Sequence, residues 1–140
     1  GAGLALAAGR PQQALDLVER HPAPQLRPAV LLHAQAQLAL QRPALASERL
    51  QTWVTTHPQD AQAWQWLAQA WQAQNQPLRA LRAQAEAQVA IRDFSAAQDR
   101  LKAAQDLARR GGNQDHIEAS IIDTRLRAVT ELLREEARKQ

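Results

Sequence analysis

The chain has 140 residues and a net charge of +3, from 17 basic and 14 acidic residues, and its length fits a single domain, residues 1–140. It contains no cysteine, which excludes disulfides, thiolate nucleophiles and cysteine-based metal sites. Its basic residues are interspersed with acidic ones and no apolar run approaches about 18 residues, so we expect neither nucleic-acid binding nor a membrane span.

Ala, Gln, Leu and Arg dominate, and aromatic residues make up only 4% of the chain, which predicts an all-helical protein. Pro and Gly divide it into segments. The segment ending at Gly9 is typical of a helix tail whose beginning is missing, so we expect an N-terminal stub and a fragment of a longer protein. Helices are predicted next over 11–20, 26–41, 43–56, 61–74, 77–91 and 93–109.

A seventh helix is predicted near the C-terminus, within residues 113–140. Gly111 and Gly112 are expected to end the preceding helix in a left-handed C-cap. Asp115, with Glu118 three residues later, forms the pattern of a capping box and predicts the start of a long helix that ends near 138. Its apolar residues follow 4-3-4 spacing and form one stripe, which is typical of a capping helix: Ile122, Leu126, Val129 and Leu133.

An offset of 34 residues relates the middle segments to one another. Pro43 and Pro77 are separated by 34 residues, as are Ala46 and Ala80, and loops and helix lengths agree at the same offset. A 34-residue period of paired helices is typical of tetratricopeptide repeats. The sequence therefore predicts an all-α solenoid of tetratricopeptide-like hairpins, with about seven helices, an N-terminal stub and a long C-terminal capping helix.

The residues of one hairpin carry a resemblance to the tetratricopeptide family. Trp64, Leu67-Ala68 and Trp71 resemble the family pattern of Trp, Leu-Gly and Tyr on the first helix, and Ala80 takes the small position at the helix crossing. We expect both indoles to pack against small residues of the next helix. The preceding hairpin departs from this pattern, because Val30, His33 and Gln37 stand where Trp, Leu and Tyr are expected, and the 11–20 helix is about one turn short.

A second resemblance runs from Trp64 to the end of the chain. Three segments, 67–71, 76–80 and 92–94, and the final-helix string Ile-Ile-Asp-Thr-Arg-Leu-Arg at 121–127, resemble the C-terminal repeat domain of BepA-type periplasmic zinc metalloproteases, which are gluzincins related to HtpX. The resemblance implies a periplasmic location and a role in outer-membrane protein assembly and quality control. It also implies that zinc and the protease domain belong to a part of the parent protein outside this chain.

The chain itself shows no catalytic or metal-binding pattern. A gluzincin needs His-Glu-x-x-His, and the four histidines here are scattered. We expect His21 and His57 to lie at helix ends, His33 to pack in the core and His116 to be exposed. Gly111-Gly112 is better explained as a helix stop than as a phosphate loop. We therefore expect no enzyme activity, cofactor or metal site in this chain.

The candidate binding surface is the groove that the first helix of each pair lines in tetratricopeptide folds. The resemblance places glutamines along this inner face, where amide groups suit extended polar peptide. Arg79 and Arg82 add a positive patch that can meet acidic residues of a partner. The alternative is that the glutamines only solvate a helix. The predicted glutamines are Gln35, Gln62, Gln65, Gln69 and Gln72.

Two functional hypotheses remain open on the sequence. The first is a protein-interaction module in a periplasmic metalloprotease, which binds substrate, the outer-membrane assembly machinery or its own protease domain. The second is a stand-alone tetratricopeptide scaffold, cytoplasmic or periplasmic, in an unrelated complex. An RNA-binding helical repeat is the least favoured hypothesis. Exposed apolar surface at the ends of the solenoid also allows a dimer.

Overall fold

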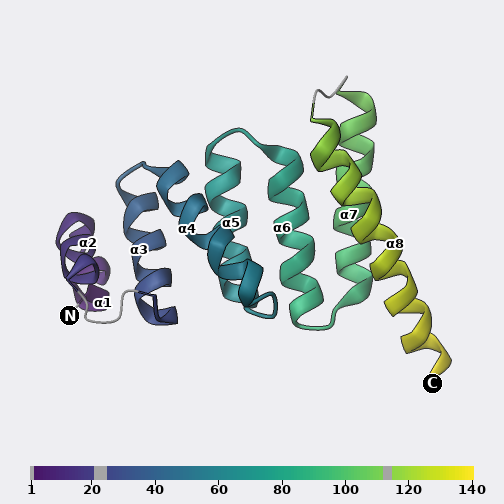
Figure 1. Ribbon diagram of the computed structural model, residues 1–140, viewed down its shortest axis with the longest axis horizontal. Helices are drawn as coiled ribbons and strands as arrows, with labels where there is room; N and C mark the ends of the chain where they lie inside the picture. The colour runs from purple at the N-terminus through teal and green to yellow at the C-terminus, as the bar shows by residue number, and fades with distance from the viewer. Residues whose placement is uncertain (1, 21–24, 112–114) are drawn as a thin grey trace.

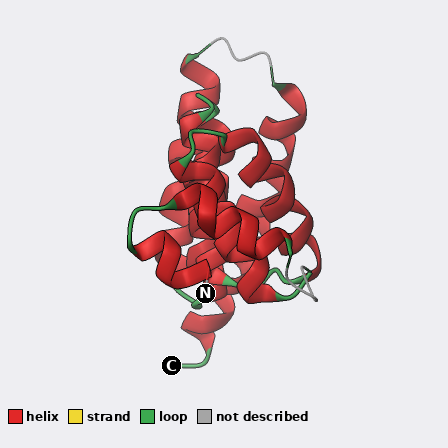
Figure 2. Cartoon of the chain, turned by 90° about the vertical axis from the view of Figure 1, so that its left-hand side faces the viewer, coloured by secondary structure: helices red, strands yellow, loops and turns green. Residues whose placement is uncertain are grey.

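The computed structural model describes residues 2–20, 25–111 and 115–140. Within these ranges all regular secondary structure is helical, as Figure 2 shows, and the predicted all-α fold is confirmed. The seven predicted helices and the stub, which forms a short helix, are all present. They are α1 (Ala2–Ala7), α2 (Pro11–Glu19), α3 (Arg27–Ala39), α4 (Pro43–Thr56), α5 (Ala61–Ala73), α6 (Pro77–Ala90), α7 (Phe94–Arg110) and α8 (His116–Arg138).

The helices pack in chain order. Each one contacts the helix before it and the helix after it, and together they form an extended row with the two termini at opposite ends (Figure 1). The arrangement is an α-solenoid, in which each hairpin is stabilised mainly by its neighbours. The buried residues accordingly form three clusters along the row: one between α1, α2 and α3, a large one from α3 to α6, and one from α6 to α8.

The central cluster is built around the two predicted indoles. Trp64 and Trp71 on α5 are 8% and 2% exposed, and they share this cluster with Ala80 and Ala83 of α6, which are fully buried. Alanine has a single methyl group, so the backbones of α5 and α6 can approach each other closely while the indoles fill the remaining space. The packing predicted from the repeat pattern is confirmed.

Four loops end the preceding helix in the same way. Gly9, Gln41, Asn75 and Arg92 each have a positive φ, between 57° and 76°. In each loop the next residue donates its N–H to a carbonyl five residues earlier, as Arg42 does to Gln37 at 2.8 Å. This is the Schellman motif, and it satisfies carbonyls that the helix end leaves unpaired. Only one of the four positions is occupied by glycine, the residue best suited to a positive φ.

The ends of α7 and α8 differ in part from the prediction. Gly111 has a φ of −82° and is not left-handed, and Gly112 lies outside the described residues. At the start of α8, Asp115 accepts a hydrogen bond from the backbone N–H of Glu118 at 2.9 Å, which confirms the predicted N-cap. Ile122 and Val129 of the predicted stripe are fully buried against α6 and α7.

Two departures from a regular repeat shape the surface. Helix α2 has 9 residues, whereas α4 and α6 have 14 each, so the predicted shortening of the first unit is confirmed. The second departure concerns the contacts between alternate helices. Helix α3 packs against α5, but α5 does not contact α7, and both of these helices are fully described. Helix α6 packs against α8 instead. A single inner face formed by α3, α5 and α7 is therefore not continuous along this chain.

The Schellman loops generate a prediction about stability. Replacing the exposed Gln41 by glycine should raise the free energy of unfolding by about 0.5–1 kcal/mol. A left-handed conformation costs a residue with a Cβ about 1–2 kcal/mol, and glycine avoids this cost. Glycine also loses more backbone entropy on folding, which offsets part of the gain. Urea denaturation measures the change. Gln41→Ala, which removes the amide and keeps the Cβ, is the control, and a stabilisation by Ala equal to that by Gly contradicts the explanation.

Candidate functional site: a groove between α3 and α4

The predicted glutamine stripe is present on α5. Gln62, Gln65, Gln69 and Gln72 are all exposed, on the face opposite the buried indoles, while Gln35 on the neighbouring α3 is partly buried. The amide oxygen of Gln62 accepts a hydrogen bond from the Arg27 guanidinium at 3.0 Å. The stripe is thus a polar helix face, and one of its members already has a partner within the chain.

The predicted positive patch is occupied from within the chain. Nε of Arg82 lies 2.6 Å from the carboxylate of Glu118, which is 2% exposed, and Arg79 lies 3.9 Å from Asp115. Both guanidinium groups also lie over the ring of Trp71, at 6.0 and 5.5 Å. The expectation that Arg82 presents its charge to a partner is corrected, because α8 folds back on α6 and supplies the acidic group itself.

The structure instead places a hollow between α3 and α4. This α3/α4 groove has a volume of about 750 Å³, within the range of roughly 300–1,000 Å³ that is usual for binding pockets. Val30 and His33 line it from α3, and α4 contributes an exposed leucine, Leu45, and a half-buried tryptophan, Trp53. Glu48, Arg49, Thr52 and His57 add polar groups to the lining. Three apolar side chains therefore line the groove together with a larger number of polar and charged residues.

Trp53 and His57 form one wall of this groove. Their rings are stacked, with centroids 3.6 Å apart and an interplanar angle of 9°. They lie four residues apart at the C-terminal end of α4, where His57 is the C-cap and its Nδ1 lies 3.2 Å from the carbonyl oxygen of Trp53. The predicted helix-end position of His57 is confirmed, and His116 is exposed as predicted, while His21 lies outside the described residues. The stack gives the groove a flat aromatic surface.

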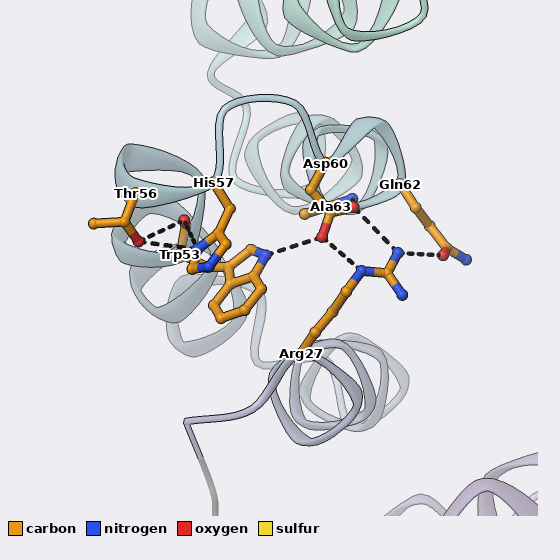
Figure 3. A network of polar contacts seen from close by, with 7 residues as sticks. All are labelled: Arg27, Trp53, Thr56, His57, Asp60, Gln62 and Ala63. Carbon is orange, nitrogen blue, oxygen red and sulfur yellow. Dashed lines mark hydrogen bonds and ion pairs between the residues drawn. The ribbon is translucent and has the colours of Figure 1, made fainter.

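Asp60 holds this wall in position by joining three helices (Figure 3). Its carboxylate accepts hydrogen bonds from Nε1 of Trp53 at 2.9 Å and from Nε of Arg27 at 2.8 Å. It also accepts the backbone N–H of Ala63 at 3.2 Å and so N-caps α5, as predicted. Burial opposes the ionisation of Asp60, but the hydrogen bonds from Arg27, Trp53 and Ala63 outweigh burial and lower its pKa.

His33 and Gln37 form a polar pair beside the floor of the groove. Nε2 of Gln37 lies 3.4 Å from Nε2 of His33, while Nδ1 of His33 and Oε1 of Gln37 are buried and have no hydrogen-bond partner among the described residues. Burial, with a smaller contribution from the positive charge of Arg49, lowers the pKa of His33 to about 4. The imidazole is therefore neutral at physiological pH. Unsatisfied buried polar atoms are rare in native proteins, and these two are enclosed by the chain and not open to the groove.

The groove was missed by the sequence analysis, although the α3 segment is irregular. Val30, His33 and Gln37 are the three positions at which the α3 segment departs from the repeat pattern. At an offset of 34 residues they correspond to Trp64, Leu67 and Trp71, which fill the central cluster. On the paired helix α4, Arg49 and Trp53 stand where α6 has Ala83 and Ala87, so the two hairpins pack differently at these positions.

Other kinds of site find no support among the described residues. No group of three or more His, Cys, Asp or Glu side chains is placed to hold a metal ion in that part of the chain. None of the helices described is both long enough and apolar enough to cross a membrane.

The Asp60 network predicts a loss of stability on removal of its charge. Asp60→Asn should lower the free energy of unfolding by about 1–2 kcal/mol, because asparagine still caps α5 but the charged hydrogen bond with Arg27 is lost. Because the folded pKa is lowered, the contribution of Asp60 is present above the pKa of the unfolded carboxyl, near 3.9, and is lost as pH falls below it.

Urea denaturation at pH 7 and at pH 3 measures both effects. Asp93→Asn is the matched control, since Asp93 N-caps α7 by the same contact with Ala96 and forms no ion pair with any residue in the described part of the chain. An equal loss in the two variants at pH 7 contradicts the role assigned to the network.

His33 predicts a second pH dependence in a separate window. Below pH 6.5 the unfolded chain protonates this histidine, but the folded protein does so only near pH 4, so stability should fall as pH is lowered from about 6.5 to 4. NMR titration of the imidazole should give a midpoint near 4. His33→Leu should remove this component of the pH dependence of unfolding, and a midpoint near 6.5 in the parent protein contradicts the prediction.

In comparisons with known proteins, no family model and no curated protein matches the chain.

Proposed function

We propose that this chain is a protein-interaction module, and that the α3/α4 groove holds a segment of its partner. One observation carries the proposal: a hollow of about 750 Å³ between α3 and α4 is lined by the exposed Leu45 and the half-buried Trp53. A solenoid suits this function, because its stacked helices offer an extended surface that binds other proteins. The exposed glutamine face of α5 adjoins the same region through the contact between Gln62 and Arg27.

The cost of leaving the groove empty supports a binding role. Apolar surface in contact with water costs free energy in proportion to its area, about 25 cal/mol per Å². A partner that covers Leu45, which is 45% exposed, and the half-buried Trp53 removes part of this cost.

The resemblance stated above supports a more specific proposal about the parent protein. We propose that the chain is the C-terminal repeat domain of a BepA-type periplasmic zinc metalloprotease, acting in outer-membrane protein assembly and quality control. The supporting residues are the Gln76-Pro77-Leu78-Arg79-Ala80 segment and the final-helix string at 121–127. In such a parent the zinc and the proteolysis belong to a separate domain, and the present chain recruits substrate or assembly partners.

Photo-crosslinking in the source cells tests both levels of the proposal. A benzoylphenylalanine placed in the full-length protein at Thr52, which is exposed at the groove, should form an adduct with a partner protein. The same probe at Lys102, exposed on α7, should not form that adduct. Equal labelling at the two positions, or none at either, overturns the interaction proposal.

The identity of the adduct decides the more specific level. An outer-membrane assembly component, an outer-membrane protein substrate or the parent's own protease domain, identified by mass spectrometry, supports the metalloprotease assignment. A Thr52-dependent adduct with a protein of an unrelated complex contradicts that assignment and favours a stand-alone scaffold.

A further inference from the structure

A second hollow lies along the contact between α7 and α8, at the C-terminal end of the row of helices (Figure 1). Its volume is about 490 Å³, within the range of roughly 300–1,000 Å³ that is usual for binding pockets. Three arginines and two acidic residues line this α7/α8 hollow, together with two neutral polar side chains and one leucine. The hollow is therefore a charged site, and its chemistry depends on which of these charges are already paired.

The two carboxylates of the α7/α8 hollow have partners within the chain. The carboxylate of Asp123 accepts a hydrogen bond from the side-chain amide of Gln105 at 2.7 Å. The carboxylate of Glu131 lies 2.7 Å from the guanidinium of Arg134 and 3.3 Å from that of Arg138. The positive charge of Arg134, which is the third arginine of the lining, is therefore balanced by Glu131.

Three hydrogen-bond donors of the hollow lack a charged acceptor among the described residues. Arg109, in the last turn of α7, forms no hydrogen bond or ion pair with any of these residues. Arg127, on α8, donates to the hydroxyl of Thr124 at 3.3 Å and has no acidic partner in the described part of the chain. The hydroxyl of Thr130 accepts a hydrogen bond from Gln98 at 3.1 Å, so its own hydrogen can still be donated.

This set of donors matches a phosphate group. A phosphate monoester carries a charge of about −1.5 to −2 at pH 7 and presents three oxygens that accept hydrogen bonds. Two guanidinium groups and a hydroxyl can supply a donor to each of the three oxygens, whereas a carboxylate has only two. The hollow is larger than a phosphate group, and Leu126 offers apolar surface to the organic part of such a ligand.

We propose that the α7/α8 hollow binds the phosphate group of a monoester, which Arg109 and Arg127 hold from the two helices and to which Thr130 donates. The site goes beyond the proposed function, because it shares no residue with the α3/α4 groove. A small phosphorylated molecule and a phosphorylated side chain of a polypeptide are the two sources of such a group. Asp123 lines the same hollow, and its negative charge opposes the binding.

Titration of the ¹⁵N-labelled chain with N-acetyl-O-phosphoserinamide at pH 6.5 and constant ionic strength, followed by NMR, tests the proposal. Saturable shifts are expected at the Nε–H groups of Arg109 and Arg127 and at the backbone amide of Thr130. N-acetyl-glutamate amide, which presents a carboxylate, should bind at least threefold more weakly, and N-acetyl-serinamide should not bind. Equal affinity for phosphate and carboxylate, or shifts of equal size at all exposed arginines, overturns the proposal.

Arginine variants locate the binding within the hollow. Arg109→Gln and Arg127→Gln should each weaken binding of the phosphoserine probe at least threefold, because a charge-assisted hydrogen bond is lost. Arg100→Gln removes the same charge from an exposed position of α7 outside the hollow, and it should change the affinity less than twofold. All three arginines are exposed, so the variants should keep the fold. An equal loss in all three variants contradicts the proposal.

Asp123 provides a test of opposite sign. Asp123→Asn removes the negative charge and keeps an oxygen for Gln105, so it should strengthen phosphate binding at least twofold. Asp99→Asn makes the same change at an exposed position of α7 outside the hollow and should change the affinity less than twofold. Equal strengthening in the two variants shows a general effect of net charge and overturns the proposal.

A capped pentapeptide with a central phosphoserine distinguishes the two sources of the phosphate. Binding at least threefold tighter than that of the single residue identifies a phosphorylated polypeptide, and equal affinity identifies a small phosphate monoester. Both results support a phosphate site, and the absence of saturable binding by either probe overturns it. The Thr52 crosslink does not depend on this hollow, so a failure of phosphate binding leaves the proposed interaction function standing.

Discussion

The contact between α5 and α6 is the interaction on which the rest of the structure depends. The indoles of Trp64 and Trp71 lie against Ala80 and Ala83, so large side chains on one helix meet methyl groups on the next. Ala80, Ala83 and Trp71 are almost completely buried. Burial of an aromatic side chain contributes several kcal/mol, which is a large share of the stability of a small domain. The other face of α6 carries Leu78 and Ala85 into the next cluster, so this helix transmits the packing towards α8.

The same arrangement explains why the candidate site lies where it does. One hairpin earlier Val30 replaces this indole, and a large ring, Trp53, stands on α4 where α6 has Ala87. His33 and Gln37 take the places of Leu67 and Trp71, and each has a buried polar atom without a partner among the described residues. A repeat protein can tolerate such a loss in one unit, because the neighbouring units continue to support it. The network of Asp60 with Arg27 and Trp53 ties α3, α4 and α5 together around the hollow, so the groove keeps its shape without a filled interior.

Local signals in the sequence predicted most of the fold. Proline at the first position of α2, α4 and α6 and Asp60, Asp93 and Asp115 as N-caps marked the helix boundaries, and the structure agrees within about two residues. Contacts between distant residues could not be predicted in this way. The pairs Arg82–Glu118 and Glu86–Arg125 join residues 36 and 39 positions apart, and they exist only because α8 packs on α6. For this reason Arg82 was predicted as a binding residue and proved to be an internal one. The groove could not be predicted from local signals either, because its shape depends on how the side chains of α3 and α4 pack against each other.

Native-state hydrogen exchange tests the central claim that indoles packed against alanine set the local stability of each hairpin. Amides of α5 should exchange only through the largest opening free energy, and amides of α3 through a smaller one. Trp64→Val should lower the opening free energy of α5 towards that of α3. Equal protection of α3 and α5 in the parent protein, or no change at α5 in folded Trp64→Val, would contradict this claim.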